Sequence, residues 1–207
     1  MSKRRRKKGV LVIIGILIIA CLVLYLILFR FGDQSSKVVD EIKKFGYTLE
    51  DRDNDLMQEK FNLLKDVLAE DEIDYLDYAE YLSELFIIDL YTLDNKLNKY
   101  DVGGCEFIHP DHQANYKLKV EDTLYRYLEE NSQRKQKLSE VVDIDAGEIN
   151  KDSFTFGEVE YDSYVAELSW GYQKDLGYDN KGTVTLIRID DKLYVAEYTA
   201  EVSEWKE

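Results

Sequence analysis

Residues 75–93 read YLDYAEYLSELFIIDLYTL, and this stretch decides the fold. Asp74 and Asp77 are suited to cap and charge the first turn of a helix. Between Leu85 and Leu90 the stretch is apolar on nearly every side, so we expect a central, buried helix. Its apolar stripe has helical spacing and consists of Tyr75, Ala79, Leu82, Phe86, Leu90 and Leu93.

Two more helices are predicted, one on each side of the central helix. The earlier helix has an apolar stripe at Met57, Phe61, Leu64 and Leu68, and a short strand-like alternation precedes it at Phe45, Tyr47 and Leu49. The later helix follows a break at 101–104. Pro110 suits its first position, where a missing N–H costs nothing. Its predicted apolar face consists of Tyr116, Val120, Leu124, Tyr127 and Leu128, and we expect it to end near Asn131.

From residue 142 onward the apolar period changes from about 3.6 to 2, which is typical of strands. Val142, Ile144 and Ala146 alternate with acidic residues, and the strongest strand carries Tyr164, Ala166, Leu168, Trp170 and Tyr172 on one face. Strands at 182–189 and 193–202 flank a predicted hairpin turn at 190–192. We expect Tyr194, Ala196, Tyr198, Ala200 and Val202 to share a face. The pattern predicts an α+β fold, with about three helices packed on a curved antiparallel sheet.

The first thirty residues combine a basic cluster with a continuous apolar run. Lys and Arg occupy residues 3–8, and an uncharged run of 21 residues follows from Gly9 to Phe29. At about 1.5 Å per helical residue this run matches the ~30 Å hydrocarbon core of a bilayer. The basic cluster predicts that the N-terminus stays in the cytoplasm. We therefore predict a cytoplasmic tail at 1–8, a single-pass transmembrane helix at 9–29, a short linker at 30–36 and an extracytoplasmic domain at 37–207.

The predicted exported part is strongly acidic. The chain has 27 basic and 42 acidic residues, and its first thirty residues hold seven of the basic ones and no acidic one. Residues 31–207 therefore have 20 basic against 42 acidic residues, a net charge of −22. Such a surface repels nucleic acid phosphates and anionic lipid headgroups. It excludes a nucleic acid partner and is consistent either with cationic partners or with solubility alone.

The two cysteines differ in their surroundings. Cys21 lies inside the apolar run, and Cys105 is the single cysteine of the predicted domain, which therefore has no internal disulfide. That pattern is typical of a bacterium that does not rely on disulfides. We expect Cys105, which precedes an apolar pair, to be a buried thiol. Residues 18–21 also resemble a lipobox, in which Cys21 would be acylated; the run continues to Phe29, which favours an uncleaved helix.

The order of helices followed by a meander, over residues 55–202, resembles the cone-shaped fold of nuclear transport factor two and of polyketide-cyclase-like proteins. The segments 86–96 (FIIDLYTLDNK), 101–104 (DVGG) and 122–125 (DTLY) are similar to uncharacterised single-pass membrane proteins of Gram-positive bacteria. A membrane-anchored cone domain also resembles the bitopic assembly proteins of type IV secretion and conjugation machines. These resemblances imply an envelope location and an assembly role, and they imply no activity.

Two polar clusters have ligand-like spacing, and neither predicts a metal site. His109, Asp111 and His112 begin a helix at a proline, where polar, solvated residues are ordinary, and a catalytic zinc usually has three protein ligands with supporting hydrogen bonds. Asp51, Asp53 and Asp55 are spaced like the first calcium ligands of an EF-hand. However, Leu56 and Asn62 replace the glycine and the bidentate glutamate that this loop needs.

Cone folds commonly enclose a pocket between the central helix and the concave sheet. Asp89, Tyr91, Trp170 and Tyr172 are polar or amphipathic residues in apolar segments, so they are the candidates for lining such a pocket; the alternative is that the aromatic rings belong to the core. The sequence has no recognisable catalytic triad, phosphate loop or dinucleotide motif. It predicts no catalytic residue, no metal and no cofactor.

These observations favour a noncatalytic interaction or assembly module of the bacterial envelope, with a protein partner. The alternative is a small-molecule-binding or cyclase-like protein that uses Asp89. A deep pocket containing Asp89 would favour the second function, and a filled cone with an exposed apolar patch would favour the first. A sensor is disfavoured because residues 1–8 offer no room for a cytoplasmic effector.

Overall fold

The computed structural model describes Ile18 and residues 36–201, and the contacts divide the chain into two units, residues 1–36 and 37–207. Among the described residues, no helix is both long and apolar enough to cross a bilayer. The predicted tail at 1–8, membrane helix at 9–29 and linker at 30–36 lie outside the described residues, apart from Ile18 and Ser36.

The central helix, α3 (Tyr75–Tyr91), confirms the prediction from residues 75–93. Asp74 caps it, since its Oδ1 accepts a hydrogen bond from the backbone N of Leu76 at 2.8 Å. All residues from Leu82 to Ile88 are buried, including Ser83 and Glu84. Leu93 is buried as well, but it follows the end of the helix.

One layer against α3 consists of α2 (Asp55–Val67) and the hairpin of β1 (Val38–Ile42) and β2 (Tyr47–Glu50). The predicted stripe of α2 is buried at Met57, Phe61 and Leu64, whereas Leu68 is the C-cap. Sequence reasoning missed β1. It also placed Phe45 in a strand, whereas Phe45 lies in the turn before Gly46, whose φ of +69° suits a glycine.

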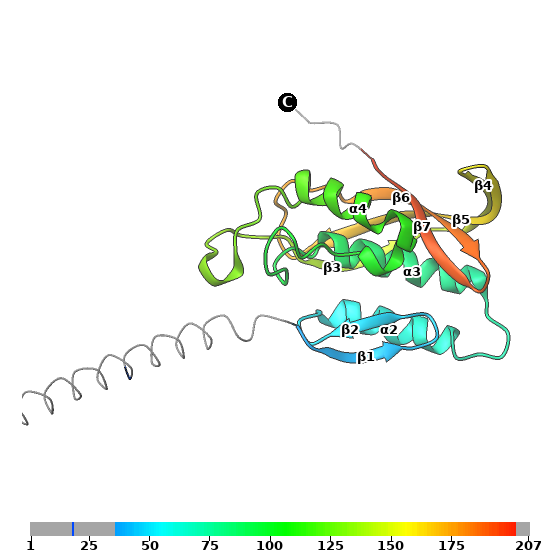
Figure 1. Cartoon of the computed structure of the whole chain (residues 1–207), viewed down its shortest axis with the longest axis horizontal. Coiled ribbons are helices and arrows are strands. Elements are labelled where there is room, and N and C mark those ends of the chain that lie inside the picture. The colour runs from blue at the N-terminus through cyan, green and yellow to red at the C-terminus, as the bar shows by residue number, and fades with distance from the viewer. Residues whose placement is uncertain (1–17, 19–35, 202–207) are drawn as a thin grey trace, which may run out of the picture. The chain divides into compact units, whose positions relative to one another are not determined.

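The other layer is a five-stranded antiparallel sheet (Figure 1). Its strands are β3 (Val141–Ala146), β4 (Asn150–Phe156), β5 (Val159–Tyr172), β6 (Lys181–Ile189) and β7 (Lys192–Ala200). They lie in the order β3-β5-β6-β7, and β4 pairs with the first half of β5. Three α-helices in the described chain and this sheet confirm the α+β class. The predicted turn between the last two strands is also confirmed, with Asp190 at a φ of 55°.

Two β-bulges correct the predicted strand faces. In β3 the register shifts between Val141 and Asp143, so Val141 is buried and Val142 is 44% exposed. In β7 the register shifts beside Ala196, because Leu186 pairs with Val195 while Thr185 pairs with Glu197. The extra residue places Tyr194 and Tyr198 on opposite faces, so the predicted common face of β7 is wrong.

The third helix, α4 (Pro110–Asp122), begins at the predicted proline but ends about nine residues before the predicted end at Asn131. Short turns follow it, and they bury Tyr125 while leaving Tyr127 76% exposed. The hydroxyl of Tyr125 donates to the carbonyl of Leu90 at 2.8 Å. This buried hydrogen bond to α3 favours the turns over a longer helix.

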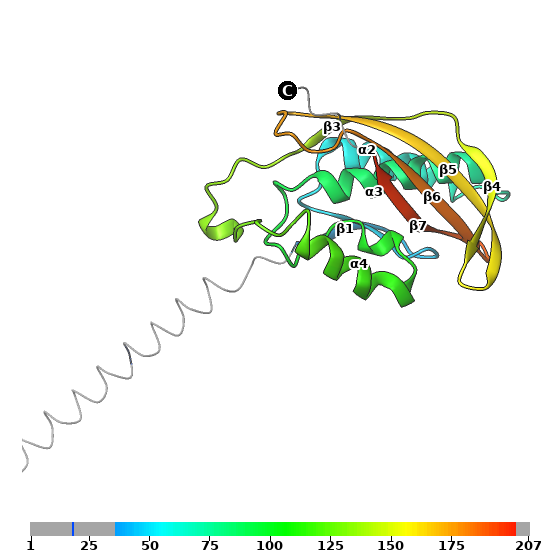
Figure 2. The same cartoon turned by 90° about the horizontal axis from the view of Figure 1, so that it is seen from above.

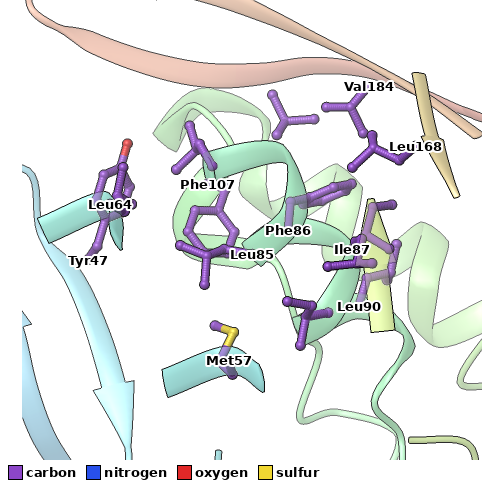
Figure 3. Packing of buried hydrophobic residues seen from close by; sticks show 14 of the residues in the cluster. Tyr47, Met57, Leu64, Leu85, Phe86, Ile87, Leu90, Phe107, Leu168 and Val184 are labelled. Atoms are coloured by element: carbon purple, nitrogen blue, oxygen red, sulfur yellow. The ribbon is translucent and has the colours of Figure 1, made fainter. Parts of the chain in front are cut away.

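The core surrounds α3 on both sides. Figure 3 shows side chains from α2 and β2 on one side of the helix and side chains from the sheet on the other. In the second view, α4 lies beside this stack (Figure 2). Two short 3-10 helices, η1 (Cys105–Phe107) and η2 (Asn131–Gln133), lie in the segments on either side of α4.

Candidate functional site

A polar cavity of about 180 Å³ lies where β2, the end of α3 and the loop after α3 meet. Charged side chains dominate its lining. They come from β2, from the loop before α2, from α3 and from the segment 96–106. The lining residues are Thr48, Glu50, Arg52, Asp53, Met57, Asp89, Lys96, Asp101, Val102, Gly103, Cys105 and Glu106.

Asp89 organises the α3 wall of the cavity. Its Oδ1 lies 2.5 Å from the Nζ of Lys96, and its Oδ2 accepts a hydrogen bond from the backbone N of Gly104 at 2.5 Å. The side chain of Lys96 is only 2% exposed, so its ammonium depends on this carboxylate. Gly103 lies directly against the helix: a Cβ at this position would be 2.0 Å from the carbonyl oxygen of Asp89.

Arg52, in the loop before α2, connects β2 to the loop after α3 across the cavity. Its Nε binds the Oε2 of Glu50 at 2.7 Å, and its two terminal nitrogens bind both carboxylate oxygens of Asp101. Burial alone would raise the pKa of Asp101, but the hydrogen bonds from Arg52 and from the backbone N of Leu97 hold it below its ordinary value. This forked pair ties the loop after α3 to the loop before α2.

Two carboxyls of the lining hold protons more tightly than usual. Burial, and then the negative charge of Asp89, raises the pKa of Glu106 to about 8, although Thr48 donates two hydrogen bonds to its Oε2. Burial also raises the pKa of Asp53 to about 6, against the opposing hydrogen bond from the backbone N of Glu50. A positive charge brought into the cavity would stabilise the ionised form of both carboxyls.

The lining is anionic overall. With Glu106 protonated, it has four carboxylates, from Glu50, Asp53, Asp89 and Asp101, against the cations of Arg52 and Lys96. The formal charge is then −2, and ionisation of Glu106 makes it −3. The cavity is therefore suited to a cationic group.

The predicted pocket residues lie in two different places. Asp89 lines the cavity, whereas Tyr91, Trp170 and Tyr172 pack together between α3 and the sheet. The rings of Tyr91 and Trp170 are 5.2 Å apart, and Tyr198 joins them through a 2.9 Å contact between its hydroxyl and that of Tyr91. The Nε1 of Trp170 donates to the hydroxyl of Tyr172 at 2.7 Å. These rings fill the space between α3 and the sheet, and their hydroxyl and indole N–H groups are all hydrogen-bonded.

The two ligand-like motifs have structural roles. His109 caps α4, since its Nδ1 accepts a hydrogen bond from the backbone N of Asp111 at 3.3 Å. Asp51 accepts from the backbone N of Lys37, Asp53 accepts from that of Glu50, and Asp55 begins α2. Within the described part of the chain, no group of three or more His, Cys, Asp or Glu residues has a geometry that could hold a metal ion.

Cys105 lines the same cavity and is half-buried. Burial, and then the charge of Asp89, raises the pKa of its thiol to about 11. In a Cys21→Ser variant at pH 7.5, we expect iodoacetamide to alkylate Cys105 at least about tenfold more slowly than it alkylates an exposed cysteine, because the thiolate is the nucleophile. The comparison protein is a Cys21→Ser/Cys105→Ser/Glu148→Cys variant. Equal rates for the two would show that burial does not protect Cys105.

Sequence reasoning missed most of the cavity. It singled out Asp89, and it considered Asp53 as part of a calcium motif, but Arg52, Lys96 and Glu106 were not recognised. One usable signal was the density of charged residues around the DVGG break at 101–104, because a charged loop beside an apolar helix must find partners for its charges.

Comparison of the chain with protein-family models, with curated proteins and with solved structures finds no match.

Proposed function

We propose that residues 37–207 form a noncatalytic interaction module on the outer face of a bacterial membrane, tethered by the apolar run 9–29. The run of 21 residues, the basic cluster before it and the acidity of the rest of the chain support this location. The module would serve an envelope assembly of the secretion or conjugation type. Its α+β fold would be a cone like that of nuclear transport factor two, with α3 against the sheet.

The packing between α3 and the sheet favours an interaction module over a cyclase-like enzyme. A cyclase-like cone keeps an open pocket there, whereas here Tyr91, Trp170, Tyr172 and Tyr198 occupy that space with mutual ring contacts and hydrogen bonds. Asp89, the acidic group that such an enzyme would use, lies on the opposite side of α3. There it pairs with the ammonium of Lys96 and accepts a hydrogen bond from the backbone N of Gly104.

The observation that carries the binding role is the charged cavity. Its formal charge of −2 and the raised pKa values of Asp53 and Glu106 favour a ligand that brings a positive charge. We infer that a partner protein inserts the ammonium or guanidinium of a Lys or Arg side chain. The acidic domain would also attract a basic partner over a longer range.

The size of the cavity decides between a side chain and a larger ligand. Pockets for drug-sized molecules have volumes of roughly 300–1,000 Å³. The cavity here is smaller, at about 180 Å³. A single long side chain or a small amine fits this volume better than a cyclase-type substrate does.

A pair of lysine derivatives tests this proposal on the full chain in detergent micelles. Nα-acetyl-lysine amide carries the ammonium, and the same compound acetylated at Nε does not. We expect saturable binding of the charged compound by NMR titration at pH 8, and at least about tenfold weaker binding of the neutral one, because only the former neutralises the cavity.

The double variant Glu106→Gln/Asp53→Asn removes the two carboxyls of the cavity that have raised pKa values. The matched control, Glu148→Gln, changes an exposed carboxyl. The double variant is expected to lose about tenfold in affinity for the charged compound, and the control none. Equal binding of both compounds, or no saturable binding by folded protein, would contradict the proposed ligand.

A further inference from the structure

One end of the domain has exposed tyrosines beside basic side chains, although the domain as a whole is acidic. Tyr100 is 59% exposed and Tyr127 is 76% exposed. The Nζ of Lys99 lies 4.8 Å from the ring centre of Tyr100, and the guanidinium of Arg126 lies 5.3 Å from that of Tyr127. We call this surface the basic end, and it consists of Lys99, Tyr100, Arg126, Tyr127, Lys135 and Lys137.

The two segments of the basic end are joined by hydrogen bonds. The backbone N of Asn131 donates to the carbonyl of Leu97 at 2.7 Å, and the guanidinium of Arg134 donates to the carbonyls of Lys96 and Leu97. Arg134 also binds the carbonyl of Glu129. The segment 123–138 therefore lies on the loop after α3, and the two tyrosines belong to one region.

A chain of contacts connects this region to the start of the domain. The backbone N of Lys37 donates to the carboxylate of Asp51, and the backbone N of Asp51 donates to the carbonyl of Lys37. Arg52, which follows Asp51, donates to the carbonyl of Asn95 at 3.3 Å. Both views place the first described residues of the domain and the loop after α4 at the same end (Figures 1 and 2). The basic end therefore lies at the same end of the domain as Lys37, the first residue of the domain.

The connection to a membrane tether at this end would be short. Seven residues, 30–36, span at most about 24 Å when fully extended. If residues 9–29 cross the bilayer, as proposed above, the end that carries Lys37 cannot lie farther than this from the headgroups. This limit on distance does not determine which surface of the domain faces the headgroups.

We propose that the basic end rests on the anionic headgroups of that membrane; this inference depends on the tether in the proposed function. Tyrosine is enriched at membrane interfaces, where its ring contacts the acyl boundary and its hydroxyl stays hydrated. Lysine and arginine beside it attract anionic lipid. The segment 123–138 has four basic and two acidic residues, a net charge of +2.

The acidity of the remaining surface strengthens the same orientation. Residues 31–207 have a net charge of −22, so anionic lipid repels most of the domain. In both views the β4–β5 turn, near Gly157, lies at the opposite end of the domain from the loop after α4 (Figures 1 and 2). Attraction at the basic end and repulsion elsewhere would therefore hold this turn away from the membrane.

A fluorescence experiment on the full chain in vesicles tests the orientation. In a Cys21→Ser/Cys105→Ser background, a dye is attached through Ser132→Cys, in the segment 123–138 that carries most of the basic end, or through Glu158→Cys in the β4–β5 turn. Both positions are exposed. With lipids that carry a spin label on the headgroup, we expect the dye at residue 132 to be quenched about threefold or more relative to residue 158 in vesicles containing phosphatidylglycerol.

Two comparisons identify the cause of the quenching. In the double variant Arg126→Ser/Tyr127→Ser, the fraction of dye at residue 132 that is quenched should fall about fivefold. Vesicles made of phosphatidylcholine alone should lower this fraction similarly for the parent chain. Equal quenching at the two dye positions would overturn the inference. Release of the unmodified chain from vesicles by alkaline carbonate would instead overturn the tether itself, so the two failures are distinguishable.

Discussion

Gly103→Ala is expected to lower the free energy of unfolding by about 3 kcal/mol or more. A Cβ on Gly103 would lie 2.0 Å from the carbonyl oxygen of Asp89 and 2.6 Å from its carbonyl carbon. These atoms belong to the backbone of α3 and cannot rotate away. The loop is also held from other sides, because the carbonyl of Gly103 accepts from the hydroxyl of Tyr116 at 2.8 Å. Urea unfolding of the full chain, followed by circular dichroism, measures the effect.

Gly171→Ala is the matched control for this prediction. A Cβ on Gly171 would have Asp143 Cβ as its nearest neighbour, at an ordinary 3.6 Å, and the backbone there has no positive φ. We expect a change of less than about 1 kcal/mol. If the two variants proved equally stable, the loop 101–104 would not lie against α3, and the cavity would not have the described wall.

Raising the pH from 5 to 8 is expected to lower the free energy of unfolding by about 7 kcal/mol, because each carboxyl with a raised pKa contributes about 1.4 kcal/mol for every unit of its shift that lies in this range. In residues 36–201, burial raises the pKa values of five carboxyls, among them Glu80 and Asp94, and three are raised furthest: Asp53 to about 6, Glu84 to about 7 and Glu106 to about 8. Glu84 is 1% exposed and pairs with Lys60 between α2 and α3, at 2.8 Å.

The direction of this effect follows from proton binding. In the unfolded chain these carboxyls titrate near pH 4, so between about pH 4 and 8 the folded state binds more protons than the unfolded state. The resulting stabilisation is fully present below the unfolded pKa values and is lost as the pH rises through the folded ones. Asp40 and Asp101 have lowered pKa values, and their contributions change below this window.

Glu106→Gln isolates one of the three groups. The amide keeps an oxygen for Thr48 but does not ionise, so we expect the decline in stability between pH 5 and 8 to shrink by about 3 kcal/mol. Glu148→Gln, at an exposed position, should keep the parental profile. Urea unfolding at four pH values provides the measurement. An unchanged profile for Glu106→Gln would exclude its titration in this range.

The helices were the most predictable part of the fold. Burial of α3 follows from side chains only three or four residues apart, and Pro110 marks the start of α4 through its own missing N–H. The end of α4 depended instead on Tyr125, whose hydroxyl bonds to α3 from 35 residues away. Such a partner is not visible in a local pattern.

The strands show the same division. The face of β5 was correct, because Tyr164, Ala166, Leu168 and Trp170 are buried in strict alternation. The strand β4 was missed because it is held by pairing with seven residues of β5, and its own sequence, NKDSFTF, has little apolar alternation. The bulges in β3 and β7 arise from register with a neighbouring strand, so alternation within one strand predicted the wrong faces there.

The sequence by itself determined the α+β class, the burial of α3 and the acidity of the domain, because periodicity and charge are properties of neighbouring residues. Only the tertiary structure decided where the chemistry lies. It separated Asp89 from Tyr91, which is two residues away, and joined Asp89 to a cavity with Glu50 and Glu106. The physical reason is that a helix turns successive side chains toward different layers, and only the packing of those layers determines which distant charges meet.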